Sequence, residues 1–191
     1  MQKFLCLVFI VAPAISTAQT QWTKEPTAVM GMMLGVPLLE SGITECEKEM
    51  SFGRLSYKFP PKGPMCYETD GTEDLALRNI PILANARATL VNGKVASVTI
   101  DAAKFRFDEF MAMLIERYGP PTNTEKESVQ VRAGGKFEAQ LISWRGKNVS
   151  IKATEMCGKI TESCFRFYHE GSMRELSEQR GAAARREANK L

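Results

Sequence analysis

The chain is poor in the residues that most often carry chemistry. It contains a single histidine, His169, and none of its five cysteines belongs to a C-x-x-C step. A zinc site needs four clustered nitrogen or sulfur ligands, so this composition argues against one. The stretch Gly134-Gly135-Lys136 lacks the first glycine and the following Ser or Thr of a phosphate-binding loop. We therefore predict no metal site and no cofactor.

Long apolar runs are also missing. The N-terminal run, residues 4–12, is far shorter than the roughly 20 residues that span a bilayer. Lys3 precedes this run, and Ser16-Thr17-Ala18 follows it with small residues, which is the pattern of a secretory signal peptide. We expect cleavage near Ala18, which removes residues 1–18 and leaves a periplasmic or secreted protein.

Export gives the remaining cysteines a structural meaning. Cys6 leaves with the signal peptide, and an even number stays in an oxidising compartment, where disulfides form. Short loops close more readily, so the spacing favours two local pairs that contribute roughly 3 and 2.5 kcal/mol in the chain-entropy model. Free thiols and a metal site are the alternatives. The predicted pairs are Cys46–Cys66 and Cys157–Cys164.

The charge of the chain is concentrated at its C-terminal end. The formal net charge is +3, and residues 19–171 carry equal numbers of acidic and basic side chains. This balance predicts no basic face for nucleic acid. The tail, residues 172–191, is rich in Glu, Gln, Ala and Arg, so we expect a helix-prone, mobile segment that could contact an anionic surface. Its basic residues are Arg174, Arg180, Arg185, Arg186 and Lys190.

The middle of the chain holds the clearest secondary-structure signals. Residues 86–91 and 94–100 read as strands joined by Asn92-Gly93, a strong hairpin signal because a type I′ turn needs positive φ at both positions. Residues 107–118 predict a helix, with Asp108 and Glu109 in the first turn and Gly119 after the end. Its apolar stripe is Phe107, Phe110, Met111, Leu114, Ile115 and Tyr118.

Further strands are expected on both sides of this helix. Residues 128–133, 136–144, 148–156 and 164–170 read as strands of a meander. In the first half, residues 28–34 look extended, and residues 37–50 suggest a short helix ending near Cys46. Residues 51–59 and 63–70 suggest strands around the turn at Pro60-Pro61-Lys62, and residues 70–79 a polar loop or a single helical turn.

The two halves of the chain show a faint similarity. Residues 90–100 and 143–152 both read as hairpins with Gly-Lys at the turn, and Gly35-Val36-Pro37 parallels Gly119-Pro120. We therefore expect an α+β fold of antiparallel β-meander sheets with one or two packed helices, two disulfides and a tandem repeat. The predicted halves are residues 19–101 and 102–171.

A helix, a G-x-P signal and a β-meander in this order resemble the β-lactamase-inhibitor-protein group. They are also similar to the single-unit fold of the small lipoprotein of the outer-membrane barrel-assembly machinery. The residues that carry this resemblance are 107–122 with the strands up to His169, and more weakly 31–100. It implies a binding module without catalytic residues. The chain lacks a lipobox cysteine, and nothing in it matches the contact loops of the inhibitor.

Three groups of residues are candidates for chemistry. His169 could act as a general base beside Ser172, oriented by Glu170, or pair with Cys164. The carboxylates of Glu109, Glu116 or the Glu45–Glu49 cluster could serve a small hydrolase. Soft thioethers suit Cu(I), so Met30, Met32 and Met33 could bind copper, although core or interface packing is the simpler interpretation.

The sequence therefore predicts a non-catalytic, exported module that binds or inhibits a protein partner in the cell envelope. A carboxylate hydrolase and a copper-binding periplasmic protein are the alternatives. Convergence of two acids with raised pKa values in a pocket would favour the hydrolase.

Overall fold

The computed structural model describes residues 22–58, 63–69, 71–80, 82, 84–130, 134–188 and 190. The predicted signal peptide, the turn at Pro60-Pro61-Lys62 and Asp70 lie outside the described residues.

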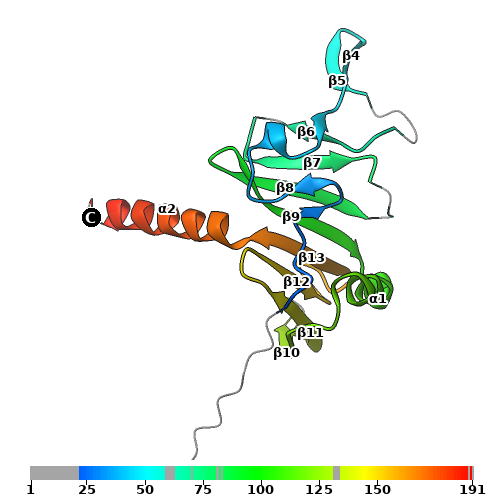
Figure 1. Cartoon of the computed structure of the whole chain (residues 1–191), viewed down its shortest axis with the longest axis vertical. Coiled ribbons are helices and arrows are strands. Elements are labelled where there is room, and N and C mark those ends of the chain that lie inside the picture. The colour runs from blue at the N-terminus through cyan, green and yellow to red at the C-terminus, as the bar shows by residue number, and fades with distance from the viewer. Residues whose placement is uncertain are drawn as a thin grey trace, which may run out of the picture.

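The described chain is an α+β protein built on one large sheet (Figure 1). The sheet has nine strands in the order β10-β11-β12-β13-β9-β8-β7-β6-β3, antiparallel except for the parallel pair of β3 and β6. This confirms the predicted fold class. The strands of the sheet are β3 (Thr44–Glu45), β6 (Cys66–Thr69), β7 (Asp74–Arg78), β8 (Asn85–Val91), β9 (Lys94–Ala103), β10 (Asn123–Gln130), β11 (Lys136–Arg145), β12 (Val149–Thr154) and β13 (Glu162–His169).

Four short strands and the helices complete the described elements. Two small hairpins stand outside the large sheet. Their strands are β1 (Ala28–Val29) with β2 (Met32–Met33), and β4 (Lys48–Ser51) with β5 (Arg54–Tyr57). The helices are α1 (Phe107–Tyr118), α2 (Glu170–Ala188) and the short 3₁₀ helices η1 (Leu38–Glu40) and η2 (Lys104–Arg106).

The structure does not show the tandem repeat. Strands from both predicted halves join one sheet, and the boundary after residue 101 falls inside β9. Among the described residues of the first half, the helical segment is the three-residue η1, which is no counterpart of α1.

The central hairpin confirms the strongest local prediction. Asn92 and Gly93 connect β8 to β9 with φ values of 50° and 73°. Both values lie in the left-handed region, which Asn and Gly tolerate at the lowest cost. The sequence therefore determined this turn locally.

Helix α1 also matches its prediction and covers one face of the sheet. The Phe110 ring stacks on Phe165 of β13 with ring centroids 4.8 Å apart, and Tyr118 meets Phe167 edge to face. Ile115, predicted in the stripe, lies at its margin and is exposed. The remaining predicted stripe residues of α1 are buried and contribute to a single core.

Two tryptophans anchor the C-terminal end of α1. The last carbonyls of a helix have no partner inside the helix. The Trp22 indole N–H donates to the Tyr118 carbonyl, and the Trp144 indole N–H donates to the Gly119 carbonyl, each at 2.8 Å. Trp22 comes from the segment that precedes β1 and Trp144 from β11, so these bonds join three parts of the chain around one helix end.

Three expectations about local structure were wrong. Residues 74–78 form β7 instead of a loop, because Leu75 and Leu77 occupy alternate positions and are buried, while Asp74 and Arg78 at the ends are exposed. The region near Cys46 holds η1, β3 and β4 instead of an α-helix. Strand β10 begins at Asn123, five residues before the expected start, because its pairing with β11 continues to Ser143.

The tail forms the helix α2, which continues through Gly181. Only its beginning is held against the sheet, where Glu175 and Gln179 bind the side chain of Asn92. The rest of the helix projects away from the sheet (Figure 1). The predicted mobility of this segment stays a prediction.

Glu25 connects the N-terminal segment to the region where β11 turns into β12. The Glu25 carboxylate accepts hydrogen bonds from the backbone N–H groups of Lys147 and Asn148, in the turn between β11 and β12, and of Val149 at the start of β12. Gly146 lies in this turn, where a Cβ would come within 2.7 Å of the Glu25 side chain. One carboxylate thus satisfies the backbone donors of a distant turn.

We predict that Glu25→Ala lowers the free energy of unfolding by about 1–3 kcal/mol, because it removes a charged acceptor from three backbone donors. Chemical denaturation of the wild type and the variant measures this change. Glu178→Ala, at an exposed position of α2, is the control and should leave the stability nearly unchanged. Equal stabilities of the Glu25 and Glu178 variants would contradict the prediction.

Candidate functional site

The hairpin of β4 and β5 is a candidate site because it carries exposed large apolar side chains. It pairs Lys48 with Tyr57 and Ser51 with Arg54, and its turn is Phe52-Gly53 with φ values of 50° and 74°. A bulky residue at positive φ is an outlier that ordinarily carries a cost. The hairpin projects from the β6 end of the sheet (Figure 1).

The tip of this hairpin is apolar. Phe52 is fully exposed, and Met50 and Leu55, which face each other across the two strands, are 71% and 65% exposed. These side chains contribute nothing to the hydrophobic core. We call Met50, Phe52 and Leu55 the hairpin tip.

The base of the hairpin is closed by the first disulfide. Cys46 and Cys66 are linked, with their Cα atoms 4.9 Å apart, as predicted from spacing. Cys46 comes just before β4, and its backbone N–H donates to the carbonyl of Tyr67 in β6 at 2.9 Å. The disulfide therefore fixes the start of the hairpin to a strand of the large sheet.

Tyr57 holds the other end of the base. Its hydroxyl donates to the Thr69 carbonyl at 2.7 Å and lies 3.2 Å from the Glu45 carboxylate. The backbone N–H of Lys58 also donates to the Glu47 carbonyl across the base. Both strands of the hairpin are thus fastened to β3 and β6, while the tip remains free.

Glu45 forms an ion pair with Lys48 at the base of the hairpin, and this pair affects the pKa of its carboxyl. Lys48 Nζ lies 2.6 Å from Glu45 Oε1. This hydrogen bond to Lys48 lowers the pKa of the Glu45 carboxyl below its usual value, against a smaller opposing effect of desolvation. The pKa of Lys48 is raised in turn, chiefly by its bond to Glu45. A general acid needs the opposite shift, so the environment of Glu45 does not suit acid catalysis.

The other carboxylate candidates show no catalytic arrangement. Glu109 pairs with Arg106 at 2.7 Å, and this bond lowers the pKa of Glu109. Glu116 is exposed seven residues further along α1, a rise of roughly 10 Å. Glu47 and Glu49 are exposed beside the hairpin base. No two of these acids are joined by a described hydrogen bond.

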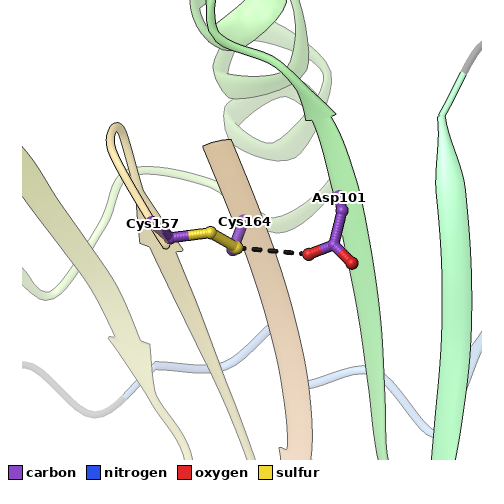
Figure 2. Close-up of side chains that lie close together, drawn as sticks. All are labelled: Asp101, Cys157 and Cys164. Atoms are coloured by element: carbon purple, nitrogen blue, oxygen red, sulfur yellow. Dashed lines mark hydrogen bonds between the residues drawn. A yellow bond between two sulfur atoms is a disulfide. The ribbon is translucent and has the colours of Figure 1, made fainter. Parts of the chain in front are cut away.

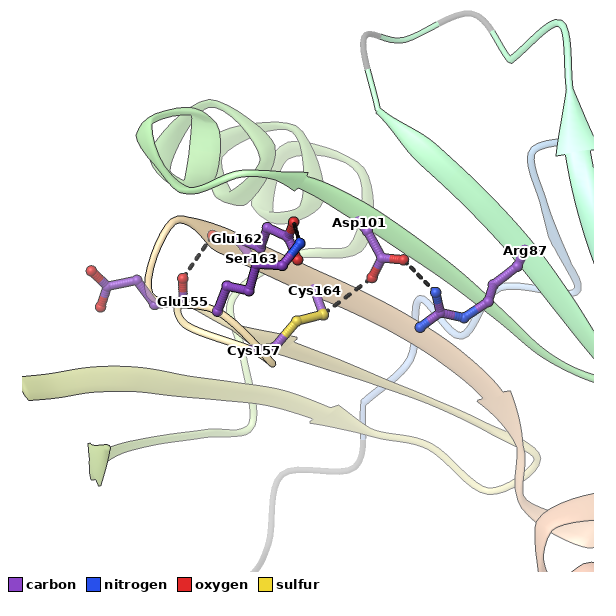
Figure 3. The surroundings of a disulfide bond; sticks show 8 residues. Arg87, Asp101, Glu155, Cys157, Glu162, Ser163 and Cys164 are labelled. Atoms are coloured by element: carbon purple, nitrogen blue, oxygen red, sulfur yellow. Dashed lines mark hydrogen bonds and ion pairs between the residues drawn. A yellow bond between two sulfur atoms is a disulfide. The ribbon is translucent and has the colours of Figure 1, made fainter. Parts of the chain in front are cut away.

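The second disulfide joins Cys157 to Cys164, as predicted, with Cα atoms 5.9 Å apart. It closes the connection between β12 and β13 and lies on the face of the sheet opposite α1. Figure 2 shows Cys164 Sγ beside Asp101 of β9, with the sulfur 3.2 Å from Oδ1. Asp101 also pairs with Arg87 of β8 at 2.6 Å (Figure 3).

Among the described residues, one group of side chains has donor atoms close enough together to hold a metal ion. Donor atoms of Asp101, Cys157 and Cys164 lie within 4.8 Å of one another. Both sulfurs are engaged in the disulfide, and the thiolate is the form of cysteine that binds metal. The oxidised cluster therefore offers a potential ion only the Asp101 carboxylate.

His169 has a structural role at the start of α2. Its Nδ1 accepts a hydrogen bond from the Ser172 backbone N–H at 3.2 Å and lies 3.0 Å from Ser172 Oγ, as in a helix N-cap. Ser172 is buried, and Glu170 binds Ser150 instead of the imidazole ring. The hypothetical triad is not assembled, and Cys164 is held in its disulfide.

The three candidate methionines lie in different environments. Met32 is fully buried in the core, whereas Met33, the next residue of β2, is partly exposed. Met30 stands in the turn with φ of 52° and packs against the core. This arrangement fits apolar packing for Met30 and Met32.

The sequence pattern does not predict the hairpin tip. The sequence predicts one strand over residues 51–59, whereas in the structure Phe52-Gly53 forms a turn between two strands of four residues each. The signal that could have found it is a glycine between two short β-prone runs, flanked by a cysteine pair.

No protein family model matches this sequence, and no curated protein or solved structure is significantly similar to it. The resemblance to the β-lactamase-inhibitor group therefore stays an expectation. In the described part of the chain, no helix combines the length and the apolar character needed to cross a membrane.

We predict that none of the four cysteines of the two disulfides is a free thiol. Thiol titration of the denatured protein without reductant should detect none of Cys46, Cys66, Cys157 and Cys164, and all of them after reduction, because both pairs are linked. Detection of all four without reductant would contradict the assignment.

We also predict that the Glu45 carboxyl titrates below the usual range of a glutamate. The ion pair is present at neutral pH and is lost as the pH falls through the lowered pKa. A side-chain NMR titration measures the midpoint. In Lys48→Met the midpoint should move up towards the ordinary value, and an unchanged midpoint would count against the role of Lys48.

Proposed function

We propose that this protein is an exported, non-catalytic binding module whose hairpin tip inserts into an apolar pocket of a protein partner in the cell envelope. The observation that carries the proposal is the tip itself: three large apolar side chains presented to solvent on a hairpin with a fixed base. Aromatic and methionine side chains are enriched at the centres of protein interfaces.

The fixed base supports binding because it lowers the entropic cost of association. A loop that is ordered before it binds loses less conformational freedom on binding. The Cys46–Cys66 disulfide and the Tyr57 hydroxyl hold both ends of the hairpin to β3 and β6. The tip is therefore presented in one orientation.

A protein pocket suits the tip better than a lipid surface. Insertion into an anionic membrane is assisted by clustered basic residues. Residues 45–58 carry Glu45, Glu47 and Glu49 against Lys48, Arg54 and Lys58, so the hairpin is formally neutral.

Export is supported by the N-terminal pattern of the sequence and by the two disulfides, which form and persist in oxidising compartments. The hydrolase alternative gains no support from the described residues, since the pKa values of Glu45 and Glu109 are lowered by cationic neighbours. An inhibitory action on the partner, as the resemblance implies, is part of the proposal.

The experiment is site-specific photo-crosslinking in cells that export the protein. A photoreactive phenylalanine analogue replaces Phe52 in one variant and Phe105 in the control. Phe105 is also almost fully exposed but stands in η2, away from the hairpin. We expect one protein adduct from position 52 that is missing from position 105.

Phe52→Ser should reduce recovery of that partner at least about tenfold, because central aromatic residues dominate interface energies, and it should leave the stability of the fold unchanged. Identical adducts from both positions, or an adduct with a second copy of this chain, would overturn the proposal.

A further inference from the structure

The face of the sheet opposite α1 carries an unusual arrangement of positive charge. Strand alternation identifies its residues. Arg166 stands between Phe165 and Phe167, which are buried in the core, and Lys152 stands between Ile151 and Ala153, which are buried as well. The side chains of Arg166 and Lys152 therefore project from the opposite, polar face.

The strand register places these cations in one row. Lys152 of β12 pairs with Arg166 of β13, Arg166 pairs with Thr99 of β9, and Thr99 pairs with Arg87 of β8. Three of these four neighbouring positions are basic. We call Lys152, Arg166 and Arg87 the cationic row, with Thr99 at the position between the two arginines.

This row carries an electrostatic cost. Like charges directly opposite on neighbouring strands destabilise a sheet. Among the described residues, Arg87 is paired with Asp101, whereas Lys152 and Arg166 form no ion pair. The sheet thus keeps two adjacent cations together at the centre of its polar face.

Carboxylates that face the row have other partners. Asp101 binds Arg87 and contacts Cys164. Asp74 binds the Thr89 hydroxyl, and Glu170 accepts a hydrogen bond from Ser150. Figure 3 shows how Arg87 and Asp101 lie side by side next to the second disulfide. Among the described residues, none of these carboxylates forms an ion pair with Lys152 or Arg166.

The dimensions of the row define the ligand. Four neighbouring strands, spaced about 4.8 Å apart, make the row roughly 14 Å long. An extended chain covers this length with about four residues, whereas a small anion would reach two of the cations. Thr99 and Ser97 are small and buried, so the long basic side chains stand above the centre of the face.

We propose that the cationic row binds an extended acidic segment of a protein, whose carboxylates lie across β12, β13, β9 and β8. Such a segment supplies the negative charge that the sheet lacks at Lys152 and Arg166. The site is separate from the hairpin tip and does not depend on the function proposed for it.

The test measures binding of a fluorescein-labelled octaglutamate peptide to the mature protein by fluorescence anisotropy at low ionic strength. The row variant is Lys152→Gln/Arg166→Gln. The control is Lys126→Gln/Lys136→Gln, which removes the same charge from β10 and β11. We expect affinity to fall about tenfold or more in the row variant and less than about twofold in the control, because close opposite charges dominate such contacts.

One further variant and two further measurements sharpen the result. Lys152→Arg/Arg166→Lys should keep the affinity within about threefold, since it preserves both charges. The row variant should unfold at the same temperature as the wild type or a higher one, because a like-charge pair is removed. Peptide binding should weaken as salt is added.

Other outcomes would overturn the proposal. Equal losses in the row and control variants would mean that only overall charge matters. Undiminished binding in the row variant would place the peptide elsewhere, for example on the basic end of α2. Tighter binding of a single-stranded oligonucleotide or an anionic vesicle than of octaglutamate would identify the surface as one for another class of partner.

Discussion

The fold depends on an apolar cover that packs against only one face of the large sheet. Helix α1 places Phe110 on Phe165, and the segment of Trp22 and Met32 extends the same cover. Burial of large apolar side chains is the dominant favourable term in folding. The opposite face carries polar and charged side chains, and Lys152, Arg166 and Arg87 are exposed there. The position of the cationic row follows from this asymmetry.

The two disulfides act where the core does not reach. Cys46–Cys66 holds the base of a hairpin with no side chain in the core, and Cys157–Cys164 closes the connection between β12 and β13 at the polar face. Cross-links of this kind stabilise mainly by restricting the unfolded chain. Hydrophobic packing therefore stabilises the centre of the described chain, and the two disulfides stabilise regions that the core does not reach.

The parts of the fold that could be predicted are those decided by local rules. Asn92-Gly93 and the stripe of α1 depend on backbone preference and on helical periodicity, and both were found. The region before β8 was harder to predict because its strands have two to five residues, too few for a clear period, and β3 pairs with β6 across a long connection. Leu75 and Leu77 did alternate, yet the polar residues around them concealed β7.

The candidate sites illustrate the same limit. The cysteine pairs followed from spacing and compartment. The hairpin tip and the cationic row did not, because one depends on which residues fail to reach the core and the other on register between strands. Lys152 and Arg166 are far from Arg87 in the sequence, and only the pairing of β12, β13, β9 and β8 brings them into line.

The attachment of the β4–β5 hairpin through the Cys46–Cys66 disulfide and the Tyr57 hydroxyl has an evolutionary consequence. Replacement of Met50, Phe52 or Leu55 leaves the core intact, since substitutions away from packed or bonded groups usually change stability little. Selection can therefore change the side chains of the hairpin tip, and with them the target that we propose for it, while the scaffold that carries the tip stays folded. The Cys46–Cys66 disulfide thus allows the scaffold to be inherited unchanged while the proposed recognition element diversifies.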